Sequence, residues 1–466
     1  MQDTTVIIIG GGPGGYETAI RLSQFDIPCI VIEKARLGGV CLNWGCIPTK
    51  ALVKSAELVS EIQDAESYGL PPIPLEIDYR SIWERKNAVV EQLVSGIEYL
   101  FRKRKIPIIN AIATSIRKEE GAYIVSTSAG EEYGSKYVIV ASGSEAKSLP
   151  GIKVDEENIL SSTGILKLDA LPQSLAIVGG GVIGCEFASI FATLGVQVTI
   201  IEFLPRLIAL EDEEISKRLA LSFKKAKIKV MTGVGVQSID GTPSGLLLNL
   251  SDNSSLYAEK VLMSVGRNPV NTLDWHKLNL TTNKGAINID RYMQTNLDNV
   301  YAIGDVTAKL QLAHTASKQG LIVAQHIAMR ENKQEFHYPE LNYTNIPRCT
   351  FTNPEIASVG YTQTEAAEVF GDIIIGKFPF AANGKAMAMN ATTGFVKTIA
   401  RADNKELVGM HIMGHGAAEL IAQGAILIST KCTAADVENM VFAHPTLSET
   451  IMESIEDLQN LSIHKI

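Results

Sequence analysis

Residues 4–33 read TTVIIIGGGPGGYETAIRLSQFDIPCIVIE and contain a complete strand–helix–strand pattern. The β-branched apolar run before Gly10 is typical of a strand that is buried on both faces of a parallel sheet. A glycine turn follows it, then a helical pattern, and then a second apolar run that ends at Glu33. The stretch therefore predicts a βαβ unit.

The same pattern recurs at residues 175–202, which read LAIVGGGVIGCEFASIFATLGVQVTIIE. Each copy carries GxGxxG after its first strand and an acid at the end of its second strand. The step from the first glycine to the acid is 33 − 10 = 23 residues in one copy and 202 − 179 = 23 in the other. The chain is predicted to be an α/β protein with two Rossmann-like dinucleotide-binding domains.

Each glycine and each acid of this motif has a physical task. The first glycine allows a tight bend, the second lets the backbone approach a pyrophosphate, and the third permits close helix–strand packing. The acid can accept hydrogen bonds from ribose hydroxyls. A pair of plain glycine-rich turns is the alternative. At the second turn NAD is favoured over NADP, since Glu202 would repel a 2′-phosphate and Arg206 is less well placed to attract one.

The composition limits the classes of partner. The 466 residues predict about three domains of roughly 150 residues each. With 42 basic and 51 acidic residues the net charge is −9, so neither nucleic acid nor a membrane surface is an expected partner. Because no apolar run reaches about 18 residues and Asp3 stands where a signal peptide would be basic, we expect a cytoplasmic chain.

Two of the six cysteines stand out, at Cys41 and Cys46 in the segment LGGVCLNWGCIPTK of residues 37–50. Five residues on a regular helix would point the two thiols apart, so we expect a turn around Gly45 to bring them together. A metal site and an inert core pair are the alternatives, and a redox-active dithiol is favoured. The other four cysteines (Cys29, Cys185, Cys349 and Cys432) are predicted to be small core residues.

The cysteine segment resembles the disulfide motif of flavoprotein disulfide reductases, and the likeness extends over essentially the whole chain. It implies that FAD occupies the first glycine turn and NAD the second, and no metal is expected. Cys41 would exchange with substrate sulfur, Cys46 would contact the flavin, and Lys50 would lie beside the flavin, paired with Glu186. The residues implied for FAD are Gly10, Gly12, Pro13, Gly14, Gly15, Glu33, Gly39, Val40, Cys41, Cys46, Lys50, Ala113, Ser142, Gly143, Ser144, Asp305, Gln311, Leu312, Ala313 and His314.

For NAD the resemblance implies Gly179, Gly181, Val182, Ile183, Gly184, Glu186, Glu202, Val236 and Gly266, with Arg267 on the same side. From the residues alone, Glu186 could equally be a surface helix residue, and His314 would be structural.

A histidine and a carboxylate stand near the end of the chain, in the segment HPTLSE of residues 444–449. The spacing allows Glu449 to orient the ring of His444 and raise its proton affinity. A helix cap, with Thr446 as the capping residue, is the alternative. The resemblance implies that His444 acts in the active site of the other subunit of a homodimer.

The resemblance also implies a domain order and an activity. We expect an FAD domain at 1–150, an NAD domain at 151–276, a central segment at 277–344 that completes the FAD site, and an α+β dimerisation domain at 345–466. The expected reaction is the NAD-dependent oxidation of a protein-bound dihydrolipoyl group, carried by a 2-oxoacid dehydrogenase complex or the glycine cleavage system. A glutathione-reductase-like enzyme and a non-catalytic FAD-binding protein are the alternatives.

Overall fold

The computed structural model describes residues 2–333, 335 and 340–465. The chain divides into two compact units, each built from separate segments. The first unit holds residues 1–51, 83–147 and 266–341, and the second holds 52–82, 148–265 and 342–466.

The first unit is built on a seven-stranded sheet. Its strands lie in the order β3 (Ile108–Asn110), β2 (Cys29–Glu33), β1 (Gln2–Ile9), β6 (Glu132–Val140), β5 (Ala122–Thr127) and β4 (Ala113–Glu119), with β19 (Val300–Ala302) paired to β6. The strands from β3 to β6 and β19 are parallel, whereas β4 and β5 form an antiparallel extension of β6. The predicted βαβ unit is thus the centre of the sheet.

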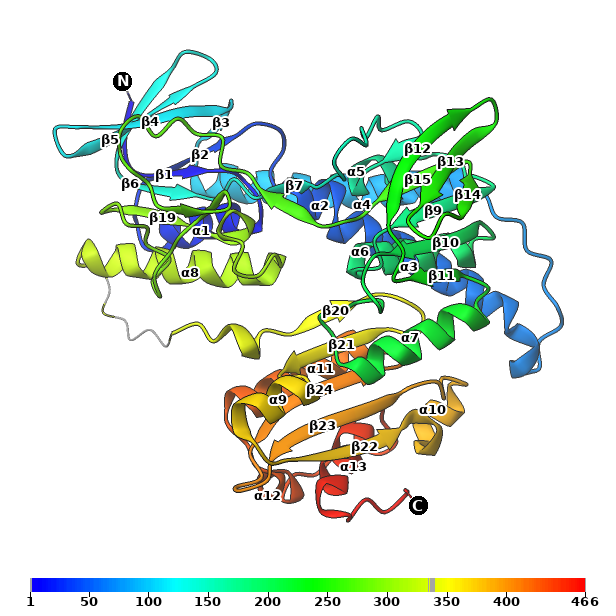
Figure 1. The fold of residues 1–466 in the computed structure, drawn as a ribbon. Helices are drawn as coiled ribbons and strands as arrows, with labels where there is room; N and C mark the ends of the chain where they lie inside the picture. The colour runs from blue at the N-terminus through cyan, green and yellow to red at the C-terminus, as the bar shows by residue number, and fades with distance from the viewer. Residues whose placement is uncertain (1, 334, 336–339, 466) are drawn as a thin grey trace. The chain divides into compact units, whose positions relative to one another are not determined.

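The faces of this sheet follow the alternation of its buried strands. Val6, Ile8 and Val31 pack with the helices α1 (Pro13–Gln24), α4 (Tyr79–Arg104) and α8 (Ala313–Arg330). Their neighbours Ile7 and Ile32 pack on the opposite face. Figure 1 shows α1 and α8 side by side along one face of the sheet.

The second unit repeats this plan in its first half. A parallel five-stranded sheet has the order β11 (Lys229–Thr232), β10 (Gln197–Glu202), β9 (Ser174–Val178), β15 (Lys260–Met263) and β8 (Ile159–Leu160). Helix α6 (Val182–Thr193) follows β9, and α7 (Glu213–Lys225) follows β10. A separate antiparallel sheet contains β12 (Val236–Thr242), β13 (Gly245–Leu250) and β14 (Ser255–Ala258). The repeat predicted from the glycine turns therefore extends to the order of the strands.

The last part of the second unit is an antiparallel five-stranded sheet. Its order is β20 (Arg348–Thr350), β21 (Ile356–Gly360), β24 (Leu407–Met413), β23 (Phe395–Arg401) and β22 (Ile373–Pro379). One face packs on α11 (Ala417–Ser429), α12 (Ala434–Glu438) and α13 (Glu449–Glu456). Residues of the opposite face, such as Phe395 and Met413, join the core that contains α6 and α7.

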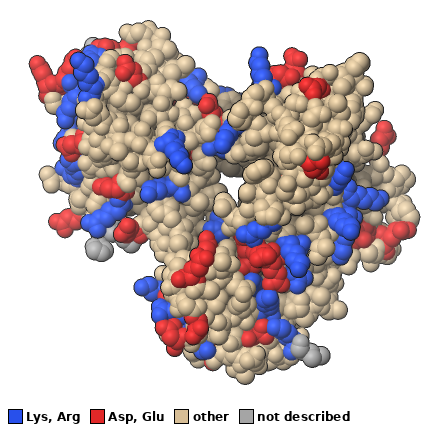
Figure 2. Space-filling model, in the orientation of Figure 1, with Lys and Arg blue, Asp and Glu red and all other residues tan. Residues whose placement is uncertain are grey.

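The α/β class is confirmed, whereas the predicted domain boundaries stay a prediction. Cys29 and Cys185 are buried as expected, but Cys349 and Cys432 are only half-buried at the edge of a core, so the core prediction is wrong for them. Among the described helices, none is long and apolar enough to cross a membrane. Acidic and basic side chains are interspersed over the face in Figure 2.

Candidate active site

The outer glycines of the two turns have the same geometry. Gly10 and Gly179 both have φ +108°, in the left-handed region that favours glycine. A Cβ added to Gly15 would lie 1.9 Å from the carbonyl oxygen of Gly10, and one added to Gly184 would lie 2.0 Å from that of Gly179. Only glycine lets either helix approach its strand so closely.

The space beside the middle glycine of each turn is empty of described atoms, as the approach of a pyrophosphate requires. A Cβ on Gly12 would come no nearer than 3.9 Å to a described atom, namely the Cα of Gly39, and one on Gly181 would meet no described atom within 4 Å. Gly12 is the N-cap of α1 and Gly181 the N-cap of α6, so each turn presents the positive end of a helix. Both turns fit the phosphates of a dinucleotide.

The two predicted ribose acids are held alike. One carboxylate oxygen of Glu33 accepts from the N–H of Gly11 (2.6 Å) and the other from that of Ala35 (2.8 Å). Glu202 accepts from the N–H of Gly180 (2.5 Å) and from the amide two positions after itself (2.6 Å). Because each oxygen keeps a lone pair, the acids can still accept from ribose hydroxyls. Val234, two residues before the predicted Val236, donates to the Glu202 carbonyl oxygen (3.1 Å).

The other residues predicted for FAD lie in the first unit. Ser144 donates to a carboxylate oxygen of Asp305, whose side chain is 25% exposed. The loop before Ser144 passes the first turn, since a Cβ on Gly10 would lie 2.3 Å from the Ala141 carbonyl oxygen. Ala113 is buried in β4, and residues 311–314 lead into α8. Their predicted contacts with FAD stay predictions.

Arg267 was expected on the NAD side, but its partners belong to the first unit. Its Nε donates to Ser144 Oγ and its Nη2 to the Ser144 carbonyl oxygen, both at 2.7 Å. The same Nε lies 4.0 Å from the carboxylate of Asp305. Gly266, predicted for NAD, also belongs to the first unit. The other predicted NAD residues, including the exposed Val182 and the half-buried Ile183, belong to the second.

The cysteine pair sits at a break between two helices. Helix α2 (Gly39–Trp44) carries Cys41, and α3 (Cys46–Gln63) begins with Cys46. Gly45 separates them with φ −148° and ψ −111°, and a Cβ there would lie 2.9 Å from the Val40 carbonyl oxygen. The turn that the sequence predicts around Gly45 is therefore present. The structure holds the pair in the reduced form, with no disulfide between Cys41 and Cys46.

The two thiols differ in their affinity for a proton. The hydrogen bond to Cys46, together with burial, raises the pKa of Cys41 well above the usual range, and the charge of Lys50 opposes this only in part. Cys46 is exposed and stands at the first turn of α3, where the helix dipole stabilises a thiolate. Of the reduced pair, Cys41 therefore keeps its proton and donates it to the Cys46 thiolate.

The predicted partners Lys50 and Glu186 belong to different units, so their pairing stays a prediction. Glu186 lies on α6 with only 4% of its surface exposed, which makes the surface alternative wrong. Its Oε1 accepts from the N–H of Phe351 (3.0 Å).

His444 and Glu449 form the predicted hydrogen-bonded pair. The ring Nδ1 lies 2.9 Å from Glu449 Oε1, and the other carboxylate oxygen accepts from the N–H of Thr446 (2.8 Å). Burial alone would raise the pKa of Glu449, but the bonds from Thr446 and His444 hold it below its usual range. Ser448 is the N-cap of α13 and the Thr446 hydroxyl donates to the Ala443 carbonyl oxygen, so the Thr446 side chain does not cap the helix. Because an ionised carboxylate only accepts, Nδ1 carries the hydrogen and Nε2 is left as the base.

Known proteins resemble this chain over nearly its full length. Residues 4–320 match the pyridine nucleotide-disulphide oxidoreductase family, and residues 346–455 match its dimerisation domain. Dihydrolipoyl dehydrogenase of Bacillus subtilis is 39% identical over 99% of this chain and 100% of its own, and that of Zymomonas mobilis is 38% identical over 98% of each.

Solved structures show the same likeness. LpdA from Mycobacterium tuberculosis superposes with a TM-score of 0.88 at 26% identity, covering 97% of this chain and 99% of its own. The HOCl-induced flavoprotein disulfide reductase RclA from Escherichia coli gives a TM-score of 0.85 at 27% identity, with the same coverage.

Proposed function

The chain belongs to the family of pyridine nucleotide-disulphide oxidoreductases, and we propose that it acts as a dihydrolipoyl dehydrogenase. The relatives named for this activity match from end to end, and the pair Cys41 and Cys46 supports the proposal because it can supply the dithiol that the reaction needs. The family uses FAD and NAD, and the two glycine turns with their acids suit the two dinucleotides.

The first step is a proton transfer. His444 Nε2 accepts the proton of a substrate thiol, while Glu449 holds the ring through Nδ1 and stabilises the imidazolium. The substrate thiolate then attacks Cys41 of the oxidised pair, the Cys41–Cys46 bond breaks, and Cys46 leaves as the thiolate. A mixed disulfide joins the substrate to Cys41.

The second step closes the lipoyl ring. The other substrate thiol attacks the substrate sulfur of the mixed disulfide and passes its proton to Cys41, which leaves as the thiol, while the first proton stays on His444. The substrate has lost two electrons as its dithiol became a disulfide, and the protein's disulfide has gained them. FAD, which the first glycine turn and Glu33 would hold, would supply the acceptor for this electron pair and the hydride donor for NAD. Cys41 thus ends the step protonated and Cys46 is the thiolate, as the raised pKa of Cys41 supports.

The remaining site assignments belong to the same proposal. The first glycine turn, Glu33, residues 142–144 and Asp305 would hold FAD, and the second turn with Glu202 would hold NAD. The carboxylate of Glu202 disfavours a 2′-phosphate and hence a glutathione-reductase-like enzyme with NADPH, and Nη2 of Arg206 is engaged by the Ala209 carbonyl oxygen (2.8 Å). The family's dimerisation domain supports a homodimer in which His444 of one subunit serves Cys41 of the other.

The physiological substrate would be the lipoyl group of a 2-oxoacid dehydrogenase complex or of the glycine cleavage system. We place this reaction in the cytoplasm, where the unpaired Cys29 and Cys185 would stay reduced.

One comparison of substrates tests the proposal. The FAD-loaded protein should reduce NAD with dihydrolipoamide and should not oxidise NADPH with glutathione disulfide. The variant Cys41→Ser should lose the first reaction yet keep its bound FAD. Full activity of this variant, or a preference for glutathione disulfide, would overturn the assignment.

A further inference from the structure

A row of polar side chains crosses the antiparallel five-stranded sheet of the second unit from edge to edge. The strand register aligns five residues, one on each of the neighbouring strands β20, β21, β24, β23 and β22. Residues that lie directly opposite each other on neighbouring strands project from the same face of a sheet. These residues, called the polar row below, are Arg348, Ser358, His411, Lys397 and Lys377. Such a row is unusual because the neighbouring residues of the same face are apolar core.

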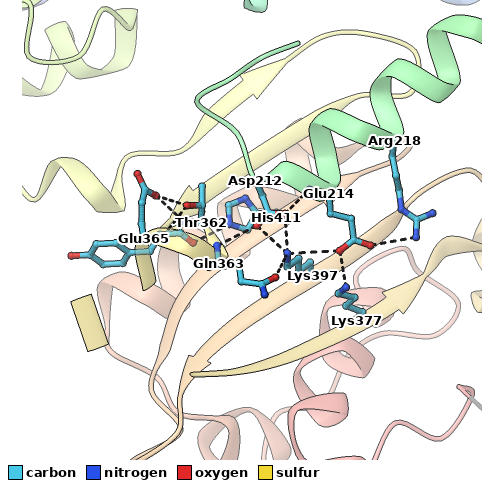
Figure 3. A network of polar contacts seen from close by, with 10 residues as sticks. Asp212, Glu214, Arg218, Thr362, Gln363, Glu365, Lys377, Lys397 and His411 are labelled. Atoms are coloured by element: carbon cyan, nitrogen blue, oxygen red, sulfur yellow. Dashed lines mark hydrogen bonds and ion pairs between the residues drawn. The ribbon is translucent and has the colours of Figure 1, made fainter. Parts of the chain in front are cut away.

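An acidic segment, residues 211–214 at the start of α7, faces this row. Asp212 binds Lys397 Nζ through both oxygens (2.8 and 3.0 Å), and Glu214 binds Lys377 Nζ (2.7 Å) (Figure 3). The side chains of Lys397 and Asp212 are only 2% and 3% exposed. Gln363 completes the site, since its Oε1 accepts from Lys397 (2.8 Å) and its N–H donates to Asp212 (3.2 Å).

The other end of the row binds Glu211. Ser358 Oγ donates to one carboxylate oxygen of Glu211 (2.5 Å), and Arg348 Nε donates to the other (3.1 Å). Glu211 is 4% exposed. Two successive acidic residues are therefore buried against two cations of the same row. Removing one member of such a buried pair leaves an uncompensated charge, so the pairs fix the segment in one place.

The same segment leads back to the NAD turn in a few residues. The N–H of Glu211 donates to the Ile208 carbonyl oxygen, and the N–H of Ile208 donates to that of Gly180, both at 2.8 Å. Leu207 packs on the turn, since a Cβ on Gly180 would lie 2.5 Å from its Cδ2. Glu202, the predicted ribose acid, lies nine residues before Glu211 and accepts from the N–H of Gly180.

We propose that the polar row and the acidic segment position the NAD site: they fix residues 203–212 and thereby set the affinity for the dinucleotide. Residues 203–212 are anchored on Gly180 and Glu202 at one end and on the polar row at the other. This inference rests on the proposed use of NAD at the second turn. The row and the acidic segment are positioning residues, because none of them belongs to the turn itself.

The test uses the FAD-loaded full chain and a double substitution, Asp212→Asn with Lys397→Met. This change removes both buried charges, while Asn can still cap α7 as Asp212 does through the N–H of Glu214 (3.0 Å). The matched control is Arg401→Gln, which breaks an exposed ion pair with Asp403 at the end of the same strand. Ser358→Ala, which removes one hydrogen bond to Glu211, serves if the double variant does not fold.

Two measurements decide the outcome. We expect the dissociation constant of NADH, from a fluorescence titration, to rise about 10-fold in the double variant and about 3-fold in Ser358→Ala, with residues 203–210 exchanging amide hydrogen faster. The KM for NAD should rise while the KM for dihydrolipoamide and the FAD content stay unchanged, and Arg401→Gln should match the unmodified chain.

Unchanged NADH binding in a folded variant would overturn the inference, and so would a parallel loss of FAD. Failure of the unmodified chain to bind NADH would instead overturn the proposed function.

Discussion

Two glycines of the second turn, three residues apart, should respond to the same substitution in opposite ways. In Gly184→Ala the new methyl carbon would lie 2.0 Å from the Gly179 carbonyl oxygen, against about 3.4 Å for an ordinary contact, so the helix or strand must give way by 3.4 − 2.0 = 1.4 Å. Overpacking of this kind costs about 1–3 kcal/mol. We expect the midpoint of thermal unfolding to fall by about 1–3 °C, since the unfolding entropy of a 466-residue chain is about 1 kcal/mol/K.

In Gly181→Ala the methyl group meets no described atom within 4 Å, and φ of −76° suits alanine. The cost is that of a poorer N-cap, below about 1 kcal/mol. The methyl group instead occupies the space through which the pyrophosphate approaches. The dissociation constant of NADH should therefore rise at least about 10-fold, or about 1.4 kcal/mol, with the FAD content unchanged.

Differential scanning fluorimetry and an NADH titration of both variants separate the two effects. Gly181→Ala should bind NADH more weakly with little change in the unfolding midpoint, whereas the main effect of Gly184→Ala should be a lower unfolding midpoint. Ordinary NADH binding by Gly181→Ala, or an unchanged midpoint in Gly184→Ala, would refute this account of the turn.

Three further predictions concern protons. In Cys46→Ser the pKa of Cys41 should fall toward its ordinary value, because the leading cause of its rise is removed, and a thiolate titration at 240 nm that matches the unmodified dithiol protein would contradict this. Glu449→Gln should lower kcat for dihydrolipoamide oxidation about 10-fold or more at unchanged NADH affinity, and a normal kcat would remove the pair from the mechanism. Burial lowers the pKa of His411 in the folded chain below its ordinary value of about 6.5. The neutral ring therefore contributes fully to the free energy of unfolding above about pH 6.5, and this contribution is lost as the pH falls toward the pKa of the folded state. In His411→Gln the unfolding midpoint should fall less between pH 7 and pH 5.5 than in the unmodified chain, and an equal fall would be contrary evidence.

Local patterns in the sequence predicted the two nucleotide turns because their causes are local. A glycine at φ +108°, a buried strand and an acid 23 residues on lie within one short stretch, and nothing distant has to be known. The same holds for Cys41, Gly45 and Cys46, where the break in the helix follows from a single glycine. The pair of His444 and Glu449 is also local, spaced five residues apart.

The polar row could not be predicted because register creates it. Arg348 and Lys377 lie at opposite edges of a sheet whose strand order is not the chain order. The one signal in the sequence is Lys397, a lone charge inside the apolar run FVKTIA of residues 395–400. The contact of Arg267 with Ser144 could not be predicted for a related reason, since the two residues are 123 positions apart.

The discontinuity of the first unit has a consequence for biosynthesis. Its sheet is complete only when β19 pairs with β6, and 300 − 33 = 267 residues separate the start of β19 from Glu33. At roughly 5–20 residues per second a ribosome needs about 13 to 53 seconds for that distance. The entire second glycine turn leaves the ribosome within this interval. The sheet that carries the first glycine turn is thus completed only after the second glycine turn has been made.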